Sequence, residues 1–342
     1  MLYFATLFDK NYLSRGIVLY NSINSVCANF KLYILCLDLE TKNYIDSNDS
    51  IFKKAETVLL SELESEDAEL YNCKSNRSVI EYYFTLSACW PNYLLKKKLV
   101  SHICTLDADI CFYSSPQKIF DYLNDYSIII TPHKFSNELK HLEIYGIYNV
   151  SFQIFKNDSV GLSCLEKWRN QCLNWCGDFL DLENNRFADQ KYLDSWMADF
   201  PSKVKVLNDN VSGLAPWNIN RFNLVIINNS FFVDLEPLIC FHFQHFKLLN
   251  KYIATNWFLP YLVKPNKAIN LLYKEYWLKI EQINKALNFK QDGSQRVNLT
   301  GNKIIQILDE KIVFLKVNTW LLVFNTKYIP ILLQRFIRKI HA

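Results

Sequence analysis

Apolar and polar residues alternate in blocks along the first hundred residues of this 342-residue chain, and each block has the length of one strand or one helix. The apolar runs predict buried strands, at 2–8, 31–38, 55–61 and 102–107. Two longer stretches predict helices, at 14–27 and at 78–90, the second broken near Pro91. Such alternation predicts parallel strands joined by helical crossovers.

The second half continues the pattern more irregularly. Further strands are predicted near 126–131, 147–155, 203–207 and 231–243, and helices at about 159–176 and 188–198. In the first of these helices Leu165, Trp168 and Cys172 recur every three or four residues, which is typical of a core-facing stripe. From about 255 the sequence becomes helical with Lys-rich faces. We therefore predict a domain at 1–252 and a mainly helical extension at 253–342.

Composition and charge narrow the class of protein. Half of the residues are hydrophobic and the net charge is +4, which suits an anionic small ligand or an anionic membrane surface and falls short of a nucleic-acid-binding signature. Ten cysteines occur without a Cys-x-x-Cys pair, so free buried thiols are expected and neither disulfides nor zinc. The N-terminus lacks the basic start of a signal peptide, and no apolar run reaches ~18–20 residues. A cytoplasmic location is expected.

The last segment, 329–340, reads as an amphipathic helix with apolar residues on one face and basic residues on the other. Two interpretations stay open. The helix lies on an anionic membrane, at its inner face, or it packs on its own domain.

The main candidate for chemistry is Asp107-Ala108-Asp109, which follows an apolar strand. In an open parallel sheet, ligands bind beyond the carboxyl ends of the strands. Two carboxylates there repel each other unless a hard divalent cation neutralises them, and such a cation also binds phosphate oxygens. Two surface acids in a turn are the simpler alternative. A haloacid-dehalogenase-type phosphatase also has Asp-x-Asp after a strand, but it needs Thr or Val where Cys111 stands.

Glycine is scarce, with seven residues in the whole chain. None of them builds a Gly-x-Gly-x-x-Gly or a Walker A loop. The sequence therefore disfavours dinucleotide oxidoreductases and P-loop kinases, and a bound phosphate would need a metal and side chains.

An ordered series of segments resembles the glycogenin-like glycosyltransferase family 8 and its bacterial relatives encoded with surface-polysaccharide genes. The matching pieces are Ala5–Tyr12, Leu106–Asp109, Tyr148–Ser151, Ala188–Gln190 and Phe241–Lys247. The resemblance implies a GT-A type α/β fold, with a mixed, mostly parallel sheet between helices and here a helical C-terminal appendage. It also implies a nucleotide-diphospho-sugar transferase that retains the anomeric configuration.

The same resemblance implies roles for individual residues. It gives Asp107, Asp109 and His242 to Mn²⁺ or Mg²⁺, and Asp189 and Gln190 to the catalytic centre. The donor-binding residues would be Thr6, Phe8, Asp9, Tyr12, Asp107, Asn149 and Lys247.

The chain departs from the family at three places. The family usually has Gly where Ser151 and His245 stand, and Lys247 comes one residue early without the following Pro-Trp.

Simpler alternatives exist for several of these residues. A lone histidine in an apolar strand, such as His242, is usually a core residue, although the basic strand end that follows favours a ligand. Arg77 binds donor phosphate or lies on a solvated face. Asp189 and Gln190 open a helix or face a sugar. Three residues are candidates either for acceptor binding or for the core, namely His133, Trp217 and Asn218.

Together these patterns predict a cytoplasmic, metal-dependent hexosyltransferase. Its donor would be a nucleoside-diphosphate sugar, and its acceptor a cell-surface polysaccharide or lipid-linked glycan. The alternatives are a sugar-phosphate nucleotidyltransferase, which normally has a Gly-rich loop after the first strand, and a non-catalytic glycan-binding member of the fold.

Overall fold

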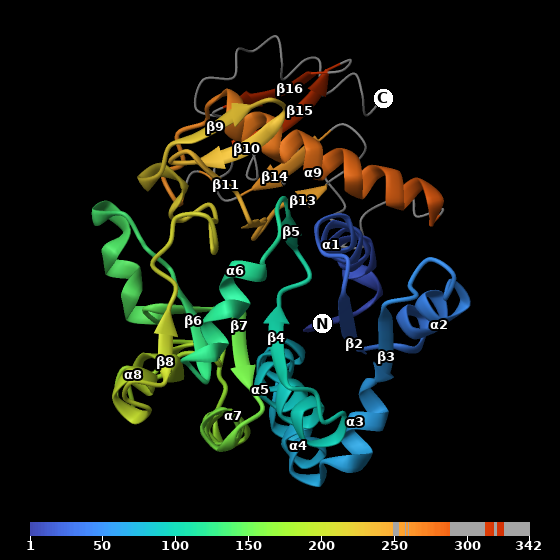
Figure 1. Cartoon of the computed structure of the whole chain (residues 1–342), viewed down its shortest axis with the longest axis vertical. Helices are drawn as coiled ribbons and strands as arrows, with labels where there is room; N and C mark the ends of the chain where they lie inside the picture. The colour runs from blue at the N-terminus through green and yellow to red at the C-terminus, as the bar shows by residue number, and fades with distance from the viewer. Residues whose placement is uncertain (249–252, 257, 259, 288–311, 318–319, 325–342) are drawn as a thin grey trace.

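The computed structural model describes residues 1–248, 253–256, 258, 260–287, 312–317 and 320–324 (Figure 1). Its centre is a seven-stranded sheet with the order β3-β2-β1-β4-β7-β6-β8. Its strands are β1 Leu2–Phe8, β2 Phe30–Cys36, β3 Ala55–Leu59, β4 His102–Leu106, β6 Ile128–Pro132, β7 Tyr148–Lys156 and β8 Val204–Val206. Within this sheet β7 runs antiparallel to both neighbours and the other described pairings are parallel. The predicted mixed, mostly parallel sheet is confirmed.

Helices connect the strands as the sequence pattern predicts. They are α1 Leu13–Val26, α2 Leu39–Ser47, α3 Leu60–Glu66, α4 Ala68–Cys73, α5 Val79–Lys97, α6 Gln117–Phe120, α7 Ser159–Asn174, α8 Trp196–Asp199 and α9 Lys267–Ala286. Hydrogen bonds with capping side chains set the first residue of the long helices α5 and α7. Ser78 and Glu81 form a capping box at α5, and the Asp158 carboxylate accepts a hydrogen bond from the Gly161 N–H at α7.

Each face of the sheet has its own hydrophobic core, because successive strand residues point to opposite faces. On one face Phe4 and Phe8 of β1 pack with residues of α1 and α9. On the other face Ala5 packs with residues of α5 and α7. Figure 1 shows α5 and α7 at one end of the molecule, with α9 and the smaller sheets at the other.

Three smaller sheets complete the described chain. One pairs β5 Ile110–Phe112 with β12 Cys240–His242, and another holds β9 Leu224–Ile227, β10 Ser230–Val233 and β11 Glu236–Pro237. The third holds β13 Lys247–Leu248, β14 Ile253–Asn256, β15 Ile312–Val317 and β16 Trp320–Phe324. The extension from 253 thus contains a long helix and strands, and α9 contacts α1. A domain boundary near 252 stays a prediction.

Three predicted elements are wrong in detail. The helix α5 continues through Pro91 to Lys97 instead of breaking, because Pro91 is buried in a packed helix face. The predicted helix at 188–198 is a 3₁₀ turn, Lys191–Ser195, followed by the four-residue α8. The apolar segment 231–243 is divided among three strands, because Asp234 and Leu235 take positive φ at a turn.

All ten cysteines are free and buried, as predicted. Among the described residues, none of the helices combines the length and apolarity needed to cross a membrane. The predicted amphipathic helix at 329–340 lies outside the described residues.

Candidate metal centre and its cavity

The strand pairing between β5 and β12 brings the two acids to the histidine. Asp107 follows the end of β4, and Asp109 directly precedes β5. In the antiparallel β5–β12 ladder Ile110 lies opposite His242, and the Phe243 N–H donates to the Asp109 carbonyl over 3.0 Å. This register places His242, 133 positions further along the sequence, beside Asp109.

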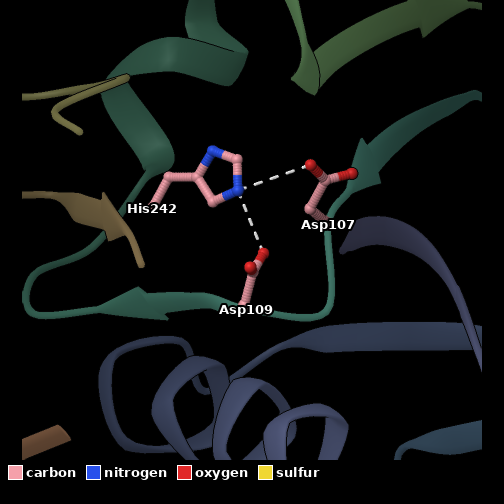
Figure 2. Close-up of side chains that lie close together, drawn as sticks. All are labelled: Asp107, Asp109 and His242. Carbon is pink, nitrogen blue, oxygen red and sulfur yellow. Dashed lines mark ion pairs between the residues drawn. The ribbon is translucent and has the colours of Figure 1, made fainter. Parts of the chain in front are cut away.

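The three side chains point toward one another (Figure 2). The His242 Nε2 atom lies 3.0 Å from Asp109 Oδ1 and 3.5 Å from Asp107 Oδ2. One ligand atom from each residue lies within 4.8 Å of the others. Two carboxylate oxygens and one imidazole nitrogen suit Mn²⁺ and also Mg²⁺, which prefers oxygen. The donor set therefore fits the divalent cation expected from the sequence.

In this cluster the pKa of each side chain depends on the charges of the others. Burial raises the pKa of Asp107 to about 6, although His242 opposes this effect. Burial also acts to raise the pKa of Asp109, but His242 and Arg15 outweigh it and hold that pKa below its usual value. Burial would lower the pKa of His242, yet the two carboxylates raise it overall. Without a cation, His242 thus takes up a proton more readily than an ordinary histidine.

Arg15 is a buried residue of this site that the sequence pattern did not reveal. It lies in α1 with 1% of its surface exposed, and its Nη2 donates to the Phe246 carbonyl over 2.9 Å. Its guanidinium also stands 4.5 Å from the centre of the Tyr12 ring. Arg15 therefore joins α1 to the chain segment that follows His242. In the sequence, the sign that Arg15 is unusual is a charged residue within the apolar stretch 13–23.

A cavity of about 600 Å³ opens beside Asp107, Asp109 and His242. This volume is within the range of ~300–1,000 Å³ typical of small-molecule sites. The structure brings together around it most of the predicted donor and metal residues, namely Thr6, Phe8, Asp9, Tyr12, Asp107, Asp109, His242 and Lys247.

His245 also lines this cavity, and its backbone φ is +59°. Glycine adopts this left-handed conformation most readily. The family that the sequence resembles usually has Gly at this position, so the chain keeps a glycine-type backbone there with a different side chain.

Helix α5 forms a wall of the cavity that sequence reasoning missed. Ile80, Tyr83, Phe84, Ser87 and Pro91 line it from one face of the helix. Their spacing is that of any amphipathic helix, and from sequence alone such a stripe is interpreted as core.

Asp189 lies behind this wall with 2% of its surface exposed. The Trp168 Nε1–H donates to the Asp189 carbonyl over 2.8 Å, and the Asp189 carboxyl interacts with Ser87. Burial raises the pKa of this carboxyl to about 7. The preceding residue, Ala188, has a φ of +46°, a strained conformation of the kind that clusters at functional sites.

Two predicted residues have partners outside the cavity. The Gln190 Nε2 donates to the Tyr145 carbonyl over 3.0 Å. The Arg77 Nη2 donates to the Leu173 carbonyl over 3.0 Å, so the guanidinium satisfies the C-terminal end of α7. Neither residue lines the cavity.

The remaining predicted residues form a buried layer beside His242. The His133 ring lies 5.3 Å from the Trp217 ring, and the Trp217 ring lies 5.3 Å from the His242 ring. The Asn149 Nδ2 lies 3.3 Å from His133 Nε2. The Asn218 Nδ2 donates to the His133 carbonyl over 2.9 Å. In this layer the Trp217 ring contacts the His242 imidazole, which it meets edge-on, and none of the four residues lines the cavity.

Comparisons with known proteins give distant relatives. No protein-family model matches the chain. The chain is 27% identical over 298 residues to the uncharacterized protein YfnD of Bacillus subtilis (strain 168), covering 85% of this chain and 94% of that protein. It is 26% identical over 256 residues to the uncharacterized protein YfnF of the same strain, covering 72% of this chain and 82% of that protein.

Among solved structures, the chain is similar to the galactosyltransferase LgtC in complex with donor and acceptor sugar analogs. That likeness has a TM-score of 0.49 at 10% identity and covers 82% of this chain and 96% of LgtC. It is also similar to the glycosyltransferase GlyE of Streptococcus pneumoniae TIGR4, with a TM-score of 0.48 at 11% identity. That match covers 86% of this chain and 65% of GlyE.

Proposed function

We propose that this chain is a metal-dependent glycosyltransferase that moves a hexose from a nucleoside-diphosphate sugar to a hydroxyl group of a cell-surface polysaccharide or lipid-linked glycan. One observation carries the proposal. Asp107, Asp109 and His242 meet at the carboxyl end of a mostly parallel sheet, on the wall of a cavity of about 600 Å³. The segments 6–12, 106–109 and 241–247, which together resemble a glycosyltransferase family, contribute to this one cavity.

Different residues of the cavity would bind different parts of the donor. A divalent cation bound by Asp107, Asp109 and His242 would neutralise the diphosphate as it leaves the sugar. Lys247 lies on the cavity wall and would add a second positive charge to the diphosphate site. Asp9 and Tyr12, which follow β1, would bind the nucleoside.

The transfer itself breaks the bond between the anomeric carbon and the diphosphate oxygen. It forms a bond from that carbon to an acceptor hydroxyl oxygen, whose proton would pass to the departing diphosphate. Asp189 would stabilise the positive charge that develops on the sugar, and in the present conformation it would act through Ser87, with which it interacts. Retention of configuration follows from the sequence resemblance and remains part of the proposal.

A thermal-shift panel tests the metal and donor assignments together. UDP-, GDP-, CDP- and dTDP-sugars are added with and without Mn²⁺. We expect one nucleotide class to raise the melting temperature only when Mn²⁺ is present. Asp109→Asn should abolish this shift while leaving the fold intact, because it keeps the size of the side chain and removes its charge. Asp49→Asn, an exposed acid on the loop after α2, is the matched control.

The outcomes separate the proposal from its alternatives. Stabilisation of Asp109→Asn equal to that of the unchanged chain would contradict the metal assignment. No response to any nucleotide or to Mn²⁺ would favour the non-catalytic glycan-binding alternative. A nucleotidyltransferase is disfavoured by the segment after β1, where Asp9 caps a 3₁₀ turn, Lys10–Tyr12, that contains no glycine.

A further inference from the structure

Three basic side chains from separate segments converge at one edge of the main sheet. Strand β6 runs in the same direction as β4, since both are antiparallel to β7, so Lys134 after β6 lies at the edge that carries the metal ligands. The Arg221 Nη1 donates to the Phe135 carbonyl over 3.4 Å, which places Arg221 beside Lys134. The Asn220 Oδ1 accepts from the Lys264 N–H over 2.9 Å, which brings Lys264 next to Arg221. We call Lys134, Arg221 and Lys264 the basic cluster.

The charges of the basic cluster are not neutralised by nearby carboxylates. The Lys134 Nζ donates to the main-chain carbonyl of Asp209. The acid that acts on Lys264 is Glu138, which has its own hydrogen bond with the Ser136 side chain. Within the described chain, none of the three basic residues forms an ion pair with an acid. The cluster therefore keeps a net positive charge.

Lys134 shows that this arrangement is unfavourable without an anion. The residue is half-buried, and burial lowers its pKa. Asp209 opposes this effect, whereas the like charge of Arg221 adds to it. The Asp209 carboxylate accepts from the N–H groups of Val211 and Ser212, over 3.0 and 2.7 Å, so its own oxygens already have donors. An anion between Lys134 and Arg221 would relieve their repulsion.

The backbone around the cluster is strained in two places. Lys134 has a φ of +53° and Leu262 a φ of +55°, values that residues other than glycine seldom adopt. The Asn220 Nδ2 donates to the Leu262 carbonyl over 2.6 Å and holds that turn beside Arg221. Strained residues of this kind cluster at functional sites. The strain is thus a second sign of function at the same place.

The basic cluster adjoins the cavity without being part of its wall. None of its three residues lines the cavity. Gln244 does line it, and the Tyr261 hydroxyl donates to the Gln244 Oε1 over 2.9 Å. The Trp217 ring lies 5.9 Å from the Tyr261 ring and 5.3 Å from the His242 ring. A molecule that extends out of the cavity past Gln244 and Tyr261 therefore reaches the cluster.

We propose that the basic cluster binds a phosphate group of the acceptor, so that the acceptor is a glycan that carries phosphate. The inference rests on the proposed function and adds the charge of the second substrate. The donor diphosphate has its own positive charges inside the cavity, in the bound cation and Lys247. Arginine binds phosphate through paired N–H groups, and lysine adds a point charge. Two sources share this chemistry, a phosphate-linked polymer and the phosphate headgroup of a lipid-linked glycan.

Single substitutions at exposed positions test the cluster and should leave the fold intact. Arg221→Gln and Lys264→Gln each remove one positive charge from an exposed side chain. Arg221→Lys keeps the charge and should keep most of the binding. Lys53→Gln, at an exposed position before β3, is the matched control.

Binding is first measured in EDTA, so that no cation links a phosphate to the metal centre. The probes are a water-soluble poly(glycerol phosphate) and vesicles of phosphatidylglycerol, with vesicles of phosphatidylcholine as the neutral reference. At least one anionic probe should bind more tightly than the neutral vesicles, and which one binds identifies the source. Arg221→Gln and Lys264→Gln should each weaken that binding roughly fivefold, the effect of one charge near a phosphate surface. Lys53→Gln should have no effect.

A second measurement asks whether the anion and the donor occupy separate places. The chain saturated with Mn²⁺ and the nucleoside diphosphate identified by thermal shift should still bind the anionic probe. Arg221→Gln and Lys264→Gln should bind that nucleoside diphosphate as the unchanged chain does, because neither residue lines the cavity.

Several results would overturn the inference. They are binding of neither anionic probe, equal binding of the neutral vesicles, and a loss in Lys53→Gln as large as that in Arg221→Gln. Displacement of the probe by the nucleoside diphosphate would also overturn it, since the anion would then lie in the donor site. If the unchanged chain binds no nucleoside diphosphate even with Mn²⁺, the proposed function itself fails, and the assignment of this anion to an acceptor fails with it.

Discussion

At the scale of single residues, cation binding at the candidate site would depend on whether its side chains are protonated. The pKa of Asp107 is raised to about 6 and that of His242 is raised above 6.5. A cation needs both groups deprotonated, so protons compete with it for the same atoms. The two acids after an apolar strand predicted a cation site from the residues themselves, whereas the family resemblance added His242 as a candidate ligand. The sequence did not predict how they affect one another, since that depends on the β5–β12 register.

This competition gives a pH dependence. We expect the affinity for Mn²⁺ to fall as pH is lowered through the raised pKa of His242 and then through that of Asp107, about 6, since each group takes up a proton. Calorimetric titration of Mn²⁺ at several pH values measures it, and the metal should displace protons into the buffer. His242→Gln should bind Mn²⁺ more weakly and with a flatter pH profile. A profile that is flat in the unchanged chain would argue against these ligands.

A second histidine links pH to the stability of the fold. The Asn149 Oδ1 accepts from the Ser151 N–H, so its Nδ2 donates to His133 Nε2, which must be unprotonated. Burial lowers the pKa of His133 to about 4, against 6.5 in the unfolded chain. Its contribution to stability is fully present above pH 6.5 and is lost as pH falls toward 4.

We expect urea denaturation between pH 7 and 4 to show this loss of unfolding free energy. His133 alone can account for at most about 3 kcal/mol of it. His133→Gln should remove part of the slope. The rest should remain, because burial also lowers the pKa of His102 to about 4. An unchanged slope in His133→Gln would contradict the assigned protonation state.

At the scale of elements, the strands and long helices were predictable where hydrophobic periodicity is regular. The runs at 2–8 and 102–107 became β1 and β4, and 159–176 became α7. Helix α5 shows the limit, because its Pro91 resembles a helix end until the packing around it is known. Its cavity-facing stripe is likewise indistinguishable in sequence from a core stripe.

Arg15 ties α1 to the segment between His242 and Lys247. Removing its charge with Arg15→Met should destabilise the fold by about 1.5–3 kcal/mol, because a buried charged hydrogen bond to the Phe246 carbonyl is lost. It should also weaken Mn²⁺ binding, since Arg15 helps to keep the Asp109 carboxyl ionised. Arg15→Lys should restore part of the metal affinity. Chemical denaturation and Mn²⁺ titration of both variants test this role. Normal Mn²⁺ binding by Arg15→Met would contradict it.

The turn from β7 into α7 depends on a close approach at Gly161. A methyl group added there would lie 2.0 Å from the Lys156 carbonyl oxygen. Gly161→Ala should therefore lower the free energy of unfolding by roughly 1–3 kcal/mol or more, in the range of overpacked cores. Ser163→Ala, at an exposed position of the same helix, is the control and should have little effect. Equal stability of the two variants would show that the turn relaxes.

At the scale of the whole molecule, the site joins the N-terminal strand, the middle of the chain and the segment near residue 245 around one sheet edge. The resemblance to a glycosyltransferase family predicted these segments by their order and spacing along the chain. The sequence could not predict the α5 wall of the cavity, because that depends on which residues of the helix face the sheet. The donor roles of Arg77 and Asn149 stay predictions, and polar atoms of both residues have partners in the packing around the cavity.

The most direct test of the account locates the cation itself. Crystals grown with Mn²⁺ and the nucleoside diphosphate identified by thermal shift are measured at the manganese absorption edge. We predict one anomalous peak in contact with Asp109, His242 and Asp107, with phosphate oxygens on its open side. A peak elsewhere, or nucleotide bound in the cavity with no metal at these three residues, would contradict the claim that this cluster holds the cation of a sugar-transfer site.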